Sequence, residues 1–85
     1  MTFCLAVFRS RTHTAGFISF MRSKGIDCQA VNTPSEAHIG CGISAKFPIG
    51  YTAFARQVIS ALGLSSFRGF FGLKREGVRY IITRL

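Results

Sequence analysis

The order of short apolar segments and helical patterns is the feature that most restricts the fold of this chain. Residues 3–8 form an apolar run bounded by charge, as expected for a central strand covered on both faces. A helical pattern follows, with Thr12 or Thr14 as N-cap and Gly25 as the stop. The apolar residues of its buried face are Phe17, Ile18 and Met21. Residues 28–31 then form a second short strand.

A capping box and an alternating strand come next. Thr33, Pro34 and Glu36 fit a capping box with proline at the first helical position, which predicts one helical turn over residues 34–38 that ends at Gly40. The residues that follow alternate between two faces up to position 47, which predicts a strand. One face carries Cys41, Ile43, Ala45 and Phe47, and the other carries Gly42, Ser44 and Lys46.

A second helix and a hairpin complete the pattern. Residues 51–62 place apolar side chains on one helical face, and Gly63 stops the helix. The expected buried residues of this helix are Tyr51, Ala55, Val58 and Leu62. Residues 67–74 and 78–84 are expected to pair as a hairpin in which Gly77 adopts a positive φ.

This order of elements predicts an α+β protein, a ferredoxin-like βαββαβ sandwich. Its sheet is antiparallel with the first and third strands inside, and both helices cover one face. The last strand, part of the hairpin, extends the sheet edge. The chain has 85 residues, nearly half of them apolar, so we expect a single domain over residues 1–85.

The net charge of +8 is high for a chain of this size. It favours anionic partners, but the basic residues are scattered from Arg9 to Arg84 rather than gathered in one run. A basic solvated surface and an anion-binding role therefore both stay open. No apolar run approaches the ~18 residues of a membrane span, and the N-terminal residues lack the order of a secretory signal. We therefore expect a cytoplasmic protein with no membrane partner.

Three cysteines form neither a disulfide framework nor a CxxC pair, so we expect reduced thiols. Cys4 is expected to be buried in its strand and Cys28 to be half buried. Cys41 has two interpretations. The alternation places it on the face of Ile43 and Phe47, which favours an inert buried thiol.

The predicted topology favours a reactive Cys41 instead. The third strand would start at the end of the sheet where the first helix begins. The positive end of the helix dipole and nearby cations would then lower the pKa of the thiol. The flanking glycines would leave the sulfur unshielded. The residues of this expected thiolate environment are Gly40, Gly42, Arg9, Arg11, Thr12 and His13.

Several of these residues also carry a family resemblance. The matching positions are Thr12, His13, Thr33, Pro34, Glu36, Cys41, Gly42 and Phe47. Their spacing resembles that of small bacterial proteins described as putative selenium/sulfur carrier protein-like, a domain of unknown function. The likeness covers roughly residues 3–63. The chain departs from the family at Ser35, where arginine is usual, and at residues 37–40, which replace a serine-rich approach to the cysteine.

The resemblance implies that Cys41 carries a terminal sulfur or selenium as a persulfide or selenosulfide, with donor and acceptor proteins as partners. His38 could assist proton transfer, and its alternative role is that of a solvated turn residue. His38 and Cys41 are too few ligands for a metal, so no metal or other cofactor is expected. Three separated carboxylates form no acid–base pair, which favours a carrier or binding protein over an enzyme. The oligomeric state stays open.

A competing pattern lies at residues 68–73, "RGFFGL", which resembles the aromatic signature of RNA-recognition motifs. That signature lies on the third strand of those domains, whereas here it follows the second helix. We therefore expect Phe67 and Phe71 to fill the core, and Phe70 to be exposed or covered in a dimer. Weak, sequence-indifferent nucleic-acid binding is the alternative function.

Overall fold

The computed structural model describes residues 2–37 and 42–85, and the side chain of Glu36 is not described. Two α-helices and five strands, with two short 3₁₀ turns, make up this part of the chain. They are β1 (Thr2–Phe8), α1 (Arg11–Ser23), β2 (Gln29–Asn32), η1 (Ser35–Ala37), β3 (Ile43–Pro48), η2 (Ile49–Tyr51), α2 (Thr52–Ala61), β4 (Phe67–Glu76) and β5 (Arg79–Arg84). None of the helices in these ranges is long and apolar enough to cross a membrane.

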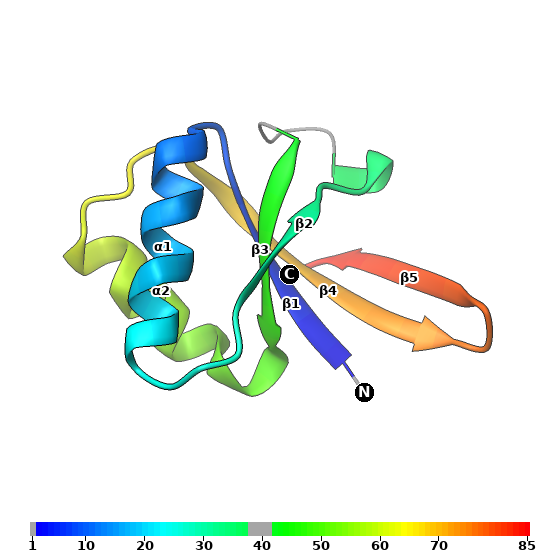
Figure 1. Cartoon of the computed structure of the whole chain (residues 1–85). Coiled ribbons are helices and arrows are strands. Elements are labelled where there is room, and N and C mark those ends of the chain that lie inside the picture. Colours follow the sequence, from blue (N-terminus) through cyan, green and yellow to red (C-terminus); the bar gives the residue numbers. More distant parts are fainter. Residues whose placement is uncertain (1, 38–41) are drawn as a thin grey trace.

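The strands form one sheet in the order β2-β3-β1-β4-β5 (Figure 1). Every neighbouring pair is antiparallel. In the centre, β1 places Val7 opposite Ser44 of β3 and Leu5 opposite Phe71 of β4. The prediction of an α+β protein with an antiparallel sheet and two helices is confirmed, and β1 and β3 are interior strands.

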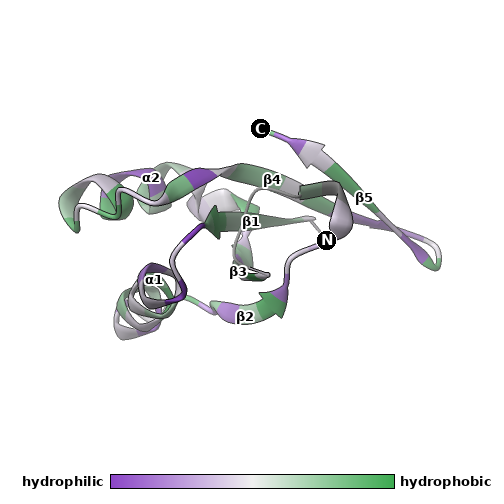
Figure 2. Ribbon diagram, turned by 90° about the horizontal axis from the view of Figure 1, so that it is seen from above, coloured by the Kyte–Doolittle hydropathy of each residue, from purple (hydrophilic) through white to green (hydrophobic). Residues whose placement is uncertain are grey.

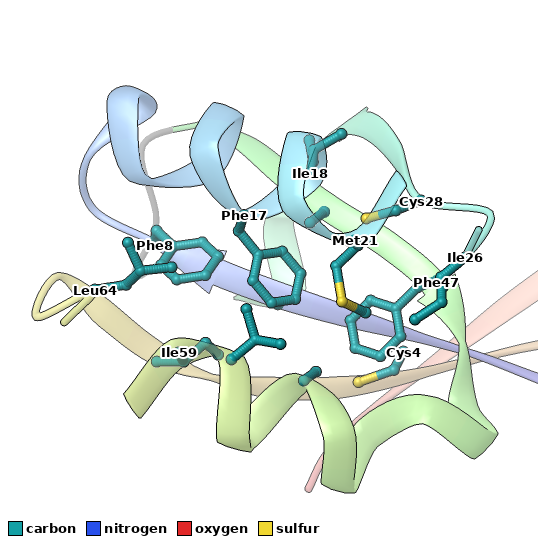
Figure 3. Packing of buried hydrophobic residues seen from close by; sticks show 14 of the residues in the cluster. Cys4, Phe8, Phe17, Ile18, Met21, Ile26, Cys28, Phe47, Ile59 and Leu64 are labelled. Carbon is teal, nitrogen blue, oxygen red and sulfur yellow. The ribbon is translucent and has the colours of Figure 1, made fainter. Parts of the chain in front are cut away.

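Both helices pack on the same face of the sheet. The even-numbered residues Cys4, Ala6 and Phe8 of β1 belong to a core cluster with residues from α1 and α2. The Phe17 ring of α1 lies 5.4 Å from the Phe8 ring and 5.9 Å from the Phe47 ring, measured between centroids. Figure 3 shows these rings between the two helices and the strands. The aromatic residues therefore hold both helices to one side of β1 and β3.

The opposite face of the sheet carries a second, smaller apolar cluster. Leu5 and Val7 of β1 pack there with Phe71 and Leu73 of β4, and the buried Ala37 of η1 belongs to the same cluster. Ser44, predicted to point away from the first core, does so, but it is fully buried on this second face. The short turn η1 therefore acts as a partial cover for the side of the sheet that has no helix.

The first helix begins earlier than predicted, because Ser10 rather than Thr12 or Thr14 is its N-cap. The Ser10 backbone is extended, and its Oγ accepts the backbone N–H of His13 at 3.2 Å. Thr14 lies within the helix, where its side chain is buried and its Oγ1 donates to the Ser10 carbonyl. The cap therefore forms directly after β1, with a connection of only two residues.

The predicted buried face of the second helix is partly wrong. Tyr51 and Leu62 are each 43% exposed, whereas Ala55, Val58 and Ile59 are buried. Residues 49–51 form a 3₁₀ turn, whose side chains repeat every three residues instead of every 3.6. Tyr51 therefore does not share the buried face of α2, and Leu62 lies just beyond its last residue.

The aromatic segment before the hairpin is divided between the two faces. Phe70 is only 2% exposed and packs on Phe67 with ring centroids 4.7 Å apart, so the expectation of an exposed Phe70 is wrong. Phe71 is buried on the opposite face, as strand alternation requires. Gly77 adopts the expected positive φ of 60° in the β4–β5 turn. Figure 2 shows both helices at one side of the molecule and this turn at the other.

Candidate functional site

Three predicted site residues, His38, Gly40 and Cys41, lie outside the described residues. The structure does describe the positions that flank them. Ala37 ends η1 on one side, and Gly42 and Ile43 lead into β3 on the other. The elements that surround this segment therefore define the candidate site.

The start of β3 lies at the end of the sheet where α1 begins. Val7 near the end of β1 pairs with Ser44 near the start of β3, and α1 starts after a short connection from β1. Arg11, the first residue of α1, lines the same groove as Ile43. Of the predicted cations, Arg11 thus shares a groove with the first residue of β3.

Two other predicted neighbours of Cys41, Arg9 and His13, form hydrogen bonds with Ser66, the residue directly before β4. The Ser66 carbonyl accepts the backbone N–H of Arg9 at 3.0 Å, and the Ser66 Oγ accepts the backbone N–H of Ser10 at 3.2 Å. The same Oγ lies 2.6 Å from Nδ1 of His13. Since β3 and β4 flank β1 on opposite sides, this network draws His13 toward the β4 side. Thr12 is exposed on the first turn of α1.

Ser66 is a residue that sequence reasoning missed. It lies between the predicted stop of the second helix at Gly63 and the strand that starts at Phe67, in a segment that has no periodic pattern. Its partners Arg9 and His13 are more than 50 positions away in the chain. Only the tertiary fold brings these groups together, so no local signal could have identified the contact.

The motif residues next to the described gap have structural partners. The Thr33 backbone N–H donates to the Gly42 carbonyl at 2.8 Å, and the hydroxyls of Thr33 and Ser44 are 2.6 Å apart. The Pro34 carbonyl accepts the N–H of Ala37 at 2.9 Å, which closes η1. Thr33 and Pro34 therefore hold η1 against the start of β3, and Phe47 fills the main core.

The backbone conformation at position 42 explains why a glycine lies directly before β3. Its φ is +97°, a conformation that residues with a Cβ rarely adopt. A Cβ at this position would meet no atom within 4 Å, so the constraint comes from the backbone and not from crowding. The glycine is thus required by the local turn.

We expect Gly42→Ala to lower the free energy of unfolding by about 1–2 kcal/mol, because alanine must adopt a left-handed φ there. Urea denaturation monitored by circular dichroism measures the change. Gly50→Ala is the matched control, since Gly50 has open space around it and no positive φ. Equal destabilisation by the two substitutions would show that the φ of Gly42 is not limiting.

The other two cysteines are buried in the main core. Cys4 and Cys28 are fully inaccessible, which corrects the expectation of a half-buried Cys28 (Figure 3). Burial raises the pKa of the Cys4 thiol. Burial also raises the pKa of Cys28 to about 11, against a smaller lowering effect of Arg22. Both thiols are therefore protonated at neutral pH and are poor nucleophiles.

Among the described residues on the sheet face opposite the helices, two aromatic rings are accessible, Phe3 and Tyr80, and neither lies on β3, the strand that carries the stacking signature in RNA-recognition motifs. Phe71 is buried there, and Phe3 is partly exposed with Nζ of Lys46 lying 4.3 Å from its ring centroid. In RNA-recognition motifs, exposed aromatic rings on this face stack on the bases. No observation on residues 2–37 or 42–85 favours the nucleic-acid alternative. The same ranges contain no group of three His, Cys, Asp or Glu side chains that could hold a metal ion.

Comparison with known protein families identifies a family that the chain matches over most of its length. The family model described as "Putative Se/S carrier protein-like" matches residues 3–66 of the chain. The matched range runs from β1 through α2 and ends just before β4. Neither the curated proteins nor the solved structures include a match to this chain.

Proposed function

Since the chain belongs to the family described as putative Se/S carrier protein-like, we propose that it carries sulfur or selenium on the thiol of Cys41. The observation that carries this proposal is the family match over residues 3–66, a range that includes Cys41. Donor and acceptor proteins for the chalcogen are the proposed partners.

The burial of the other cysteines supports Cys41 as the carrier. The chain has three cysteines, and two of them, Cys4 and Cys28, are inaccessible with raised pKa values. A carrier thiol must reach a donor protein and must react as a thiolate. Neither buried cysteine meets these two requirements, which leaves Cys41 as the candidate.

The proposed transfer step is a thiolate exchange without net oxidation. The Cys41 thiolate attacks the outer sulfur of a donor persulfide, R–S–SH. The S–S bond of the donor breaks, a new S–S bond forms at Cys41, and the donor leaves as the thiolate R–S⁻. The same exchange with R–S–SeH gives a selenosulfide. An acceptor thiolate later removes the outer atom by the reverse exchange.

The proposed surroundings of Cys41 favour its thiolate. Arg11 lines a groove with Ile43, two positions after Cys41, and the N-terminus of α1 lies at the same end of the sheet. Gly42 is exposed and adds no side chain beside the sulfur. Gly40 and His38 complete the proposed site, with His38 as a candidate for proton transfer. Arg9 and His13 are assigned a weaker role as nearby polar groups, and Thr12 forms part of the exposed first turn of α1.

We further propose that residues 1–85 form one ferredoxin-like domain with β5 added at the sheet edge. This proposal is supported by the interior positions of β1 and β3 and by the packing of both helices on one face. The motif residues Thr33, Pro34, Glu36 and Phe47 are assigned to the framework that holds the carrier segment.

Mass spectrometry after treatment with glutathione persulfide tests the carrier role. The reduced, folded protein is expected to gain the mass of one sulfur atom on the peptide that contains Cys41. Dithiothreitol is expected to remove this mass, because it reduces persulfides. Cys41→Ser should abolish the adduct, whereas the matched control Cys28→Ala should retain it.

Two results would contradict the carrier role. One is a folded, reduced sample that gains no sulfur at Cys41. The other is an adduct of equal amount in the Cys41→Ser variant, which would place the reactive thiol elsewhere. Circular dichroism spectra of both variants verify that the fold is kept.

A further inference from the structure

A groove runs between α1 and the edge strand β2, and we refer to it as the α1–β2 groove. Its volume is about 500 Å³. Its floor is apolar and includes Ala15 and Ile18 of α1, Ala30 of β2 and Ile43 of β3. Arg11 and Arg22 line it from the first and last turns of α1. The groove is therefore an apolar channel with a cation at each end.

The outer edge of β2 borders this groove with backbone groups that point away from the sheet. Thr33 donates its N–H to Gly42, and the register continues with Val31 opposite Ser44 and Gln29 opposite Lys46. In an antiparallel pair, alternate residues direct their N–H and C=O groups to the neighbour and the others direct them outward. Ala30 and Asn32 are therefore the residues whose backbone groups face outward. The adjacent Cys28 carbonyl accepts Nε–H of Arg22 at 2.8 Å.

The charge of the groove indicates whether its ligand is acidic or basic. The chain has three acidic residues, and none of them is among the groove residues that the structure describes. Two arginines without a carboxylate beside them in the groove favour a partner with acidic groups. An outward-facing strand edge favours a partner with a free, extended backbone.

The length of the groove distinguishes a peptide from a small molecule. Arg11 and Arg22 are eleven positions apart on α1, which corresponds to a rise of about 16 Å along the helix. A small anion cannot contact both ends of this distance. An extended strand rises by about 3.3 Å per residue, so a segment of roughly five to seven residues spans it.

We propose that the α1–β2 groove binds an extended acidic peptide of a partner protein, which adds to β2 as a sixth strand. Its backbone pairs with the outward groups of Ala30 and Asn32. Alternate side chains enter the apolar floor, and carboxylates at its two ends meet Arg11 and Arg22. A second copy of this chain is a poor occupant, because both copies carry a net charge of +8. The proposal does not depend on the sulfur chemistry of Cys41.

A seven-residue probe with the sequence Glu-Thr-Val-Thr-Val-Thr-Glu, blocked at both ends, tests the proposal by NMR titration of the isotope-labelled protein. We expect saturable shifts of the Ala30 and Asn32 amides and of residues along α1, but not in the β4–β5 hairpin. A probe with glutamine in place of glutamate should bind about tenfold more weakly. The absence of shifts along β2 at millimolar probe would overturn the proposal.

N-methylated probes test the strand pairing without any change to the protein. Methyl groups on the valine amides block one edge of the probe, and methyl groups on the threonine amides block the other. An added strand uses only one edge, so one methylated probe should bind like the parent and the other should lose binding. Equal binding of both would exclude strand addition.

Two test variants and two control variants examine the contribution of the protein's own residues. Arg11→Glu should weaken binding about tenfold or more, and the matched control Arg79→Glu, with the same charge change on the distant hairpin, should change it less than twofold. Ala30→Pro removes an outward N–H and should abolish binding while keeping the β2–β3 pairing, since proline is tolerated at such edge positions. Equal effects of the two charge reversals would indicate only nonspecific attraction. Cys41→Ser should bind the probe normally, which separates this proposal from the carrier function.

Discussion

Phe47→Ala is expected to lower the free energy of unfolding by about 3–5 kcal/mol, the typical cost of removing a buried phenylalanine ring. The Phe47 side chain is fully buried, and its ring centroid lies 5.9 Å from that of Phe17 and 6.3 Å from that of Phe70. It thus joins α1, β3 and β4 in one cluster. Small domains have a total stability of about 5–15 kcal/mol, so this variant should be close to unfolding. Urea denaturation measures the change.

Two controls make the Phe47 result specific. Phe47→Leu keeps most of the buried volume and should cost much less than the alanine variant. Val78→Ala removes a side chain that is 94% exposed and should change stability by less than about 0.5 kcal/mol. A small effect of Phe47→Ala, similar to that of Val78→Ala, would contradict the central packing role of this ring.

Cys4 and Cys28 are expected to react with iodoacetamide at least 10³-fold more slowly in the native protein than in urea, as an order-of-magnitude estimate. Both are fully buried, so alkylation requires local or global opening of the core. While the core is closed, the pKa of Cys28, raised by burial to about 11 from 9.0, keeps its thiol protonated at neutral pH, so the closed state contributes no labelling of its own. Peptide mapping after timed alkylation measures each site.

The pH dependence and the unfolded protein serve as controls for the thiol prediction. In urea, all cysteines should label at similar rates, because burial no longer distinguishes them. In the native state, labelling of Cys28 should continue to rise up to about pH 11, since its thiolate forms only near the raised pKa. Fast native labelling of Cys28 at pH 7 would contradict its burial.

The sequence is sufficient to predict the elements that depend on local patterns. The apolar run at 3–8 marks the central strand, the alternation before Phe47 marks β3, and Gly77 marks the hairpin turn. These signals depend on residues close together in the chain, so they are readable without tertiary information. The strand register and the Ser66 hydrogen bonds depend on contacts between distant parts of the chain. They therefore cannot be predicted from the sequence pattern.

The wrong predictions at Cys28 and at the N-cap of α1 have a common physical origin. Cys28 is flanked by polar residues, which predicts a half-buried side chain, yet it is fully buried in the core cluster that also contains Met21 of α1. Ser10 replaces the threonines as the N-cap because the chain leaves β1 already extended at that residue. In both places, the path of the backbone between elements decides the outcome, and that path is not encoded in the periodicity.

The second apolar face was not predicted, because its cover comes from distant parts of the chain. Ala37 of η1 lies about 30 positions from Leu5 and Val7, and Phe71 of β4 lies about as far beyond Ala37. The strand alternation alone gives no sign of which segment will cover a face. This cluster also explains why the aromatic segment at 68–73 does not form an exposed stacking surface.

β4 lies outside the range that the family model matches, yet it is part of the folded sheet. The match ends at residue 66, but β4 begins at Phe67 and pairs with every residue of β1, from Thr2 to Phe8. Phe70 and Leu73 of this strand contribute to the two opposite core clusters. A protein cut at residue 66 would expose one full edge of its central strand and would lose side chains from both cores. The range matched by the family model is thus shorter than the part of the chain that forms the sheet and its two core clusters.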